Sequence, residues 1–71
     1  MSWTLKINGM LQSFEPSPEL STLGDLLEHL QIEQTAVVAE VDGQIVLRQD
    51  FDKTPLRDGQ SIELIRFVGG G

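Results

Sequence analysis

The chain has 71 residues, and its five Lys and Arg against eleven Asp and Glu give a formal net charge of −6 at pH 7. Because nucleic-acid binding depends on a basic surface that neutralises phosphates, this charge argues against a nucleic-acid partner. The absence of cysteine and the single histidine exclude disulfides, thiolate metal sites and a cysteine nucleophile. A domain of this size builds only a modest core, so we do not expect it to enclose a deep active site.

No apolar run approaches the roughly 20 residues that span a bilayer. The first seven residues also lack the basic and apolar regions of a signal peptide. We therefore expect a cytoplasmic protein without a membrane partner.

A β-hairpin is predicted at the start of the chain. Residues Trp3–Ile7 alternate apolar and polar side chains, which is the period of a half-buried strand. Asn8-Gly9 is typical of a two-residue hairpin turn, and Met10–Phe14 is the expected return strand. Pro16 and Pro18 then exclude a helix interior, so an extended connection should follow the hairpin.

A short amphipathic helix is predicted after Thr22, whose hydroxyl can cap the first turn. Asp25 stands three residues later, as in an acidic variant of the capping box, and lies near the positive end of the helix dipole. Gly24 indicates either close packing of the helix or a tolerated weak point. One face should pack on a sheet, because four leucines recur at helical spacing: Leu23, Leu26, Leu27 and Leu30.

A second hairpin and a polar connection follow the helix. Residues 36–41 form an apolar, β-branched run, and Asp42-Gly43 supplies a turn into residues 44–47. Residues 48–59 are mostly polar, and we expect a loop there with one short helical turn around Asp50–Lys53.

The last predicted strand is apolar on both faces, which fits a central strand or an exposed binding patch. Its Ile62 and Leu64 point to one side, and its Ile65 and Phe67 point to the other. Because Ile62 and Leu64 already fill the helix-facing side, we favour a partner interface at Ile65, Phe67 and Val68 over burial in the core.

The order of the elements predicts an α+β fold with one main helix on one face of a mixed, four- to five-stranded sheet. A right-handed crossover allows the first strand to pair in parallel with the final strand, residues 61–67, at the centre of the sheet. This is the ubiquitin-like β-grasp arrangement. We expect it to occupy residues 1–68 and to leave residues 69–71 as a flexible tail.

Three glycines follow the last strand: Gly69, Gly70 and Gly71. Such residues pack nothing in a sheet and lose much entropy on ordering, so a tail is predicted. A backbone without side chains can thread a narrow channel on a partner and present its terminal carboxylate there. The alternative is an ordinary frayed terminus, or added glycines without function.

Five segments carry a resemblance to a known family: Asn8-Gly9, the helix at 22–30, VVAEVDGQIVLR at 37–48, DGQSIELI at 58–65 and FVGGG at 67–71. Together they resemble ThiS, the sulfur carrier proteins of thiamin biosynthesis, over essentially the whole chain. Leu47 stands where the family often has Pro, and Asp42 where Asn is common. The tail has three glycines where two are the minimum, and none of these departures removes the terminal glycine.

The resemblance implies a sulfur carrier rather than an enzyme. An adenylating, E1-like activating enzyme would use ATP and Mg²⁺ to adenylate the carboxylate of Gly71. A cysteine desulfurase or another sulfur donor would then displace AMP and leave a thiocarboxylate, which would supply sulfur to thiazole synthase. The chain itself would bind no cofactor and no metal.

Three other functions stay open on the sequence. They are the molybdopterin synthase small subunit, whose chains tend to be longer, a ubiquitin-like modifier, and an interaction domain with an inert tail.

Side chains outside the tail are better explained by structure than by chemistry. His29 lies off the leucine stripe and is expected in solvent, and Asp50 and Asp52 are expected in a polar loop. The stretch from Glu15 to Asp42 has seven acidic residues and no Lys or Arg, so the helix side should be strongly negative. That charge either steers a basic partner or only favours solubility.

Overall fold

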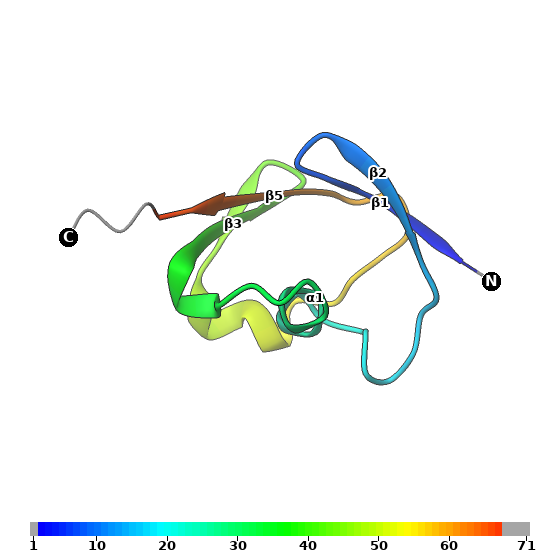
Figure 1. Ribbon diagram of the computed structural model, residues 1–71, viewed down its shortest axis with the longest axis horizontal. Helices are drawn as coiled ribbons and strands as arrows, with labels where there is room; N and C mark the ends of the chain where they lie inside the picture. Colours follow the sequence, from blue (N-terminus) through cyan, green and yellow to red (C-terminus); the bar gives the residue numbers. More distant parts are fainter. Residues whose placement is uncertain (1, 68–71) are drawn as a thin grey trace.

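This computed structural model describes residues 2–67 (Figure 1). They contain five strands, one α-helix and two 3₁₀ helices. In chain order they are β1 (Trp3–Ile7), β2 (Met10–Phe14), α1 (Leu23–His29), η1 (Gln34–Ala36), β3 (Val37–Val41), β4 (Gln44–Val46), η2 (Arg48–Lys53) and β5 (Ser61–Arg66).

The predicted elements are confirmed in type and order, with small shifts at their ends. β3 begins one residue later than expected, because Ala36 closes η1 instead of opening the strand. The helical turn expected near Asp50 is η2, a six-residue 3₁₀ helix. The last strand ends at Arg66 rather than Phe67.

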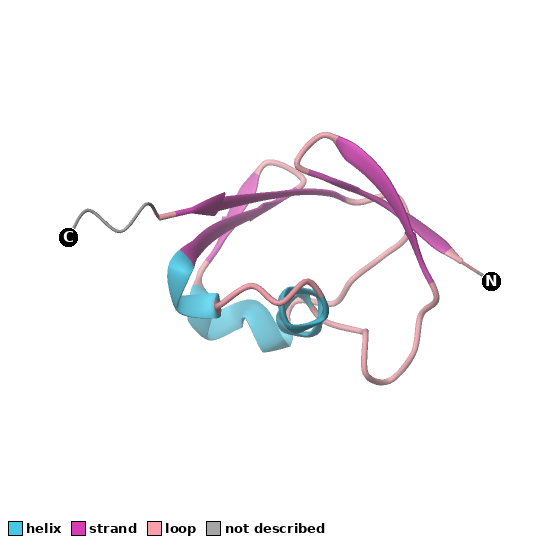
Figure 2. Cartoon of the chain, in the orientation of Figure 1, coloured by secondary structure: helices cyan, strands magenta, loops and turns pink. Residues whose placement is uncertain are grey.

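The strands form one mixed sheet in the order β2-β1-β5-β3-β4. The first and last strands pair in parallel, with Lys6 opposite Ser61 and Ile7 opposite Ile62. The other neighbours are antiparallel, and α1 lies across one face of the sheet (Figure 2). This arrangement is the ubiquitin-like β-grasp, so both the predicted fold and the predicted parallel pair are confirmed.

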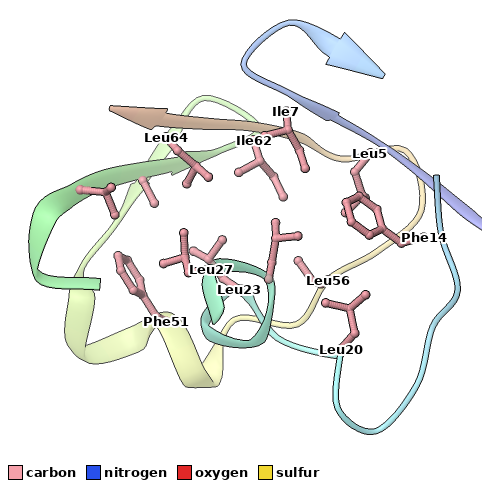
Figure 3. Close-up of a cluster of buried hydrophobic side chains, with 13 residues drawn as sticks. Leu5, Ile7, Phe14, Leu20, Leu23, Leu27, Phe51, Leu56, Ile62 and Leu64 are labelled. Carbon is pink, nitrogen blue, oxygen red and sulfur yellow. The ribbon is translucent and has the colours of Figure 1, made fainter. Parts of the chain in front are cut away.

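The core fills the space between α1 and the sheet (Figure 3). Inward residues of β1 and β5 meet three leucines of α1, Leu23, Leu26 and Leu27, whereas Leu30 is only half-buried. The connections contribute three further buried side chains that the sequence did not mark as core: Leu20, Phe51 and Leu56. Burying a side chain of this size contributes about 1.5–3 kcal/mol, so these connections are part of the hydrophobic core.

The start of α1 is fixed by the predicted capping box. The Asp25 N–H donates to the Thr22 hydroxyl oxygen, and the Thr22 N–H donates to the Asp25 carboxylate, both at 3.1 Å. The N–H of Ser21 also donates to this carboxylate, at 3.0 Å. Hydrogen bonds from the backbone of Ser21 and Thr22 hold the pKa of Asp25 below its ordinary value. The charged form of Asp25 is therefore the one that holds the first helical turn.

The two hairpin turns also position the central strand. Asn8-Gly9 and Asp42-Gly43 have positive φ at both residues, as a type I′ turn requires. The side-chain oxygen of Asn8 accepts from the N–H of Leu64 at 2.7 Å, and that of Asp42 accepts from the N–H of Ser61 at 2.9 Å. Because β1 ends at Ile7, its backbone no longer offers an acceptor to β5 at this point. The side chain of Asn8 supplies that acceptor. Each turn is thereby tied to β5.

Gly24 lies where α1 packs against η2. A Cβ atom at this position would collide with the carboxylate of Asp52 and would lie 3.2 Å from Nε2 of Gln34. Close packing, rather than a tolerated weak point, therefore explains the glycine.

Replacing Asn8 should destabilise the fold through the backbone of β5. In Asn8→Gly the turn keeps its positive φ, but the part-buried N–H of Leu64 loses its acceptor, so we expect a loss of about 1–3 kcal/mol. Asn8→Asp retains an acceptor and should lose less. Urea unfolding measures both, and an Asn8→Gly variant as stable as wild type would show that this hydrogen bond is dispensable.

The effect of Gly24→Ala should depend on Asp52. Alanine improves helix propensity by about 1 kcal/mol, but in the wild-type background the new methyl group must displace the Asp52 carboxylate. In an Asp52→Ala background that obstacle is absent and the gain should appear. A double-mutant cycle in urea measures the coupling, and strictly additive effects would contradict the proposed clash.

Candidate functional site

The structure defines the point from which the glycine tail continues. The N–H of Phe67 donates to the carbonyl oxygen of Ala36 at 2.8 Å, so the chain is still paired one residue beyond β5. Val68 and the predicted reactive segment, Gly69, Gly70 and Gly71, lie outside the described residues. The end of β5 lies beside the start of β3, away from the start of β1 (Figure 1).

Ile65 and Phe67 point away from the core, as the alternation of the last strand predicts. They are 53% and 60% exposed, whereas Ile62 and Leu64 on the opposite side are 0% and 6% exposed. β5 is therefore a central strand with apolar side chains on both faces, one face covered by α1 and the other open.

Three apolar residues from neighbouring strands extend this surface. Val38 is the register partner of Ile65, and residues opposite each other in a sheet share a face. Ile45 on β4 is opposite Glu40 of β3, and Leu47 stands two residues beyond Ile45, where β4 has ended. Ile45 and Leu47 are exposed, and Val38 is half-buried. We call this group the outer patch: Val38, Ile45, Leu47, Ile65 and Phe67.

The sequence identified only part of the outer patch. The run at residues 36–39 is apolar on both faces, and nothing in a single strand indicates which of its residues share a face with Ile65. The register of β3 against β4 and β5 was the missing information. Once the strand order was predicted, pairing Val38 with Ile65 could have shown that Val38 belongs to the outer patch.

The helix side carries the predicted negative charge but does not form a ligand set. An open hollow of about 420 Å³ is lined by Glu19, Asp25, Glu28 and His29. Asp25 is engaged in the capping box, and the ring of the exposed His29 makes a T-shaped contact with the ring of Phe14, with centroids 5.7 Å apart. Among residues 2–67 there is no group of three or more His, Cys, Asp or Glu that could hold a metal ion.

Asp50 and Asp52 have structural roles in η2. The backbone carbonyl of Asp50 accepts from the Thr54 hydroxyl at 2.7 Å, and the side chain of Asp52 approaches Gly24. The carboxylates of Asp50 and Asp52 are therefore not arranged as an acid–base pair. The helices among the described residues are all too short or too polar to cross a bilayer.

Comparison with known proteins agrees with this architecture. Residues 5–71 match the ThiS family. The chain belongs to this family. The match begins within β1 and includes the whole outer patch and the three final glycines.

Relatives of the ThiS family resemble this chain over nearly its full length. The sulfur carrier protein ThiS of Bacillus subtilis (strain 168) is 31% identical over 67 residues, which are 94% of this chain and 98% of that protein. A crystal structure of the thiamine biosynthesis protein ThiS from Geobacter metallireducens has a TM-score of 0.71 and 31% identity, covering 96% of this chain and 99% of its own. A solution NMR structure of a thiamine biosynthesis protein from the same organism has a TM-score of 0.75 and 31% identity, with 96% and 87% coverage.

Replacing Phe67 with Ala should separate partner binding from folding. Because Phe67 is mostly exposed, its loss should change the free energy of unfolding by less than about 0.5 kcal/mol. If the outer patch binds the activating enzyme that the family resemblance implies, affinity should fall by about 2 kcal/mol. Urea unfolding and calorimetric titration measure the two effects.

Ile62→Ala is the matched control on the buried side of the same strand. It should destabilise the fold by about 2–5 kcal/mol. A Phe67→Ala variant that behaves in the same way would place Phe67 among the residues that support the core.

Proposed function

We propose that this protein is a sulfur carrier for the thiazole moiety of thiamin and that Gly71 carries the sulfur as a C-terminal thiocarboxylate. Membership of the ThiS family is the observation that carries the proposal. The name of the Bacillus subtilis relative, sulfur carrier protein ThiS, supports it. In this role the chain has no catalytic site of its own, and it is consumed and regenerated as a co-substrate.

The chemistry explains why such a carrier needs an activating enzyme. A carboxylate is a poor electrophile, because its negative charge opposes attack at the carbonyl carbon. Transfer of AMP from ATP to the Gly71 carboxylate converts it into a mixed anhydride with a good leaving group and releases pyrophosphate. The outer sulfur of a persulfide on a cysteine desulfurase or another donor can then attack the carbonyl carbon and release AMP, which leaves an acyl disulfide. A second thiol cleaves its S–S bond, forms a disulfide with the donor's cysteine and leaves the thiocarboxylate, which supplies sulfur to thiazole synthase.

ATP and Mg²⁺ belong to the activating enzyme in this scheme, and the carrier contributes positioning. The backbone pairing of Phe67 with Ala36 ends the described part of the chain at the outer patch, which contains Phe67. We assign the outer patch and Val68 to the partner interface, and Gly69, Gly70 and Gly71 to the channel that leads to the reactive centre. A cytoplasmic location is part of the same proposal.

Deleting Gly70 and Gly71 together leaves fewer than the two glycines that are the family minimum, so this deletion should abolish activation and leave the fold intact. After incubation with ATP, Mg²⁺, the activating enzyme and a sulfur donor, intact-mass analysis of wild type should show one oxygen replaced by sulfur. The deleted chain should show no such increment. Its urea unfolding should match wild type, since β5 and the last described hydrogen bond precede the tail.

Met10→Ala is the control, because Met10 is exposed and lies outside the outer patch. It should be thiolated like wild type. Failure of the intact carrier to gain sulfur would overturn the proposal. Conjugates on lysines of other proteins would identify a modifier instead, and sulfur transfer to molybdopterin synthase would reassign the pathway.

A further inference from the structure

Two carboxylates lie opposite each other on the outer face of the sheet. Glu40 of β3 and Glu63 of β5 are register partners, and such partners project on the same side with Cβ atoms about 4.5–5.5 Å apart. Ile65 follows two residues after Glu63 and is exposed, which places the pair on the face away from α1. Like charges at this spacing repel each other, so the free protein keeps an unfavourable pair at the centre of its sheet.

Basic side chains on the carrier compensate for this pair at most in part. Lys6 is the only Lys or Arg that the described strands place on the outer face. Its register partner is Ser61, so it lies diagonal to Glu63 and two strands away from Glu40. Arg66 alternates with Ile65 and points to the helix-facing side, opposite Val37. No Lys or Arg of the described strands therefore faces both carboxylates.

The outer patch adjoins the pair on two sides. Ile45 is opposite Glu40 on β4, and Val38 and Ile65 form the next outward-facing pair along β3 and β5. A protein that covers the outer patch must therefore also exclude water from Glu40 and Glu63. Burying two unpaired carboxylates is costly, so the partner that fits this face supplies a positive charge.

We propose that Glu40 and Glu63 together bind an arginine side chain of the activating enzyme at the border of the outer patch. This inference rests on the proposed function, because it takes that enzyme as the partner. A planar guanidinium has five N–H donors and can engage two carboxylates at once, whereas an ammonium is a compact point charge. An apolar surface without such a cation would bury the pair unpaired, so the two glutamates also select against wrong partners.

The test compares Glu40→Gln, Glu63→Gln and the double variant as full-length carriers. ATP–pyrophosphate exchange by the activating enzyme from the same organism gives the half-saturating carrier concentration and the maximal rate. Each single variant should raise the half-saturating concentration about tenfold. The maximal rate should stay unchanged, because the tail is intact. In the isolated carrier each variant should raise the urea midpoint, because the repulsion is relieved.

Glu19→Gln is the matched control, because it removes the same charge from the helix side. It should leave the half-saturating concentration within about twofold, as expected for a distant exposed charge. Lys6→Met tests the internal alternative. If Lys6 neutralised the pair, its removal would lower the urea midpoint of wild type but not of Glu63→Gln, and that result would overturn the inference.

Two further outcomes separate this inference from the proposed function. Unchanged half-saturation in both glutamine variants, together with normal activation of wild type, would overturn the arginine site and leave the carrier function standing. A wild-type carrier that supports no exchange, or a carrier lacking both Gly70 and Gly71 that supports it fully, would overturn the carrier function itself.

Discussion

The parallel pairing of β1 with β5 sets the position of every other part of this protein. It makes the last strand the central one, with a hairpin on either side. Both hairpins are fastened to it by the side chain of a turn residue, Asn8 on one side and Asp42 on the other. One face of β5 supports the core and the other supports the outer patch, so a single strand relates the packing of α1 to the surface that a partner would meet.

Local signals in the sequence were sufficient for the strands, α1 and η2 and for their order, whereas η1 was not predicted. The alternation of Trp3–Ile7, the two hairpin dipeptides and the capping box at Thr22 each depend on neighbouring residues, so they can be recognised in isolation. The rule that crossovers are right-handed then favoured the parallel central pair. The fold followed from these few statements without any knowledge of side-chain contacts.

Features that depend on distant contacts could not be predicted in this way. Phe51 and Leu56 are isolated apolar residues in a polar stretch, and without periodicity nothing marked them as core. Gly24 had two explanations in the sequence, and only the approach of Asp52 from η2 decides between them. The facing pair Glu40–Glu63 is invisible until the register of β3 against β5 is known. For Gly71, the resemblance to a family supplied the proposed role, because no local physical signal distinguishes a reactive glycine from an inert one.

The central place of β5 also ties folding to the synthesis of that strand. A ribosome releases the two hairpins and α1 before β5, yet in the sheet β1 and β3 are joined only through β5. Isolated two-stranded hairpins are at best marginally stable in water, and pairing of segments far apart in the chain comes late in folding. A nascent or broken chain that stops before Ser61 therefore stays open to cellular proteases. Every folded copy of the chain therefore contains β5, the strand that precedes the glycine tail.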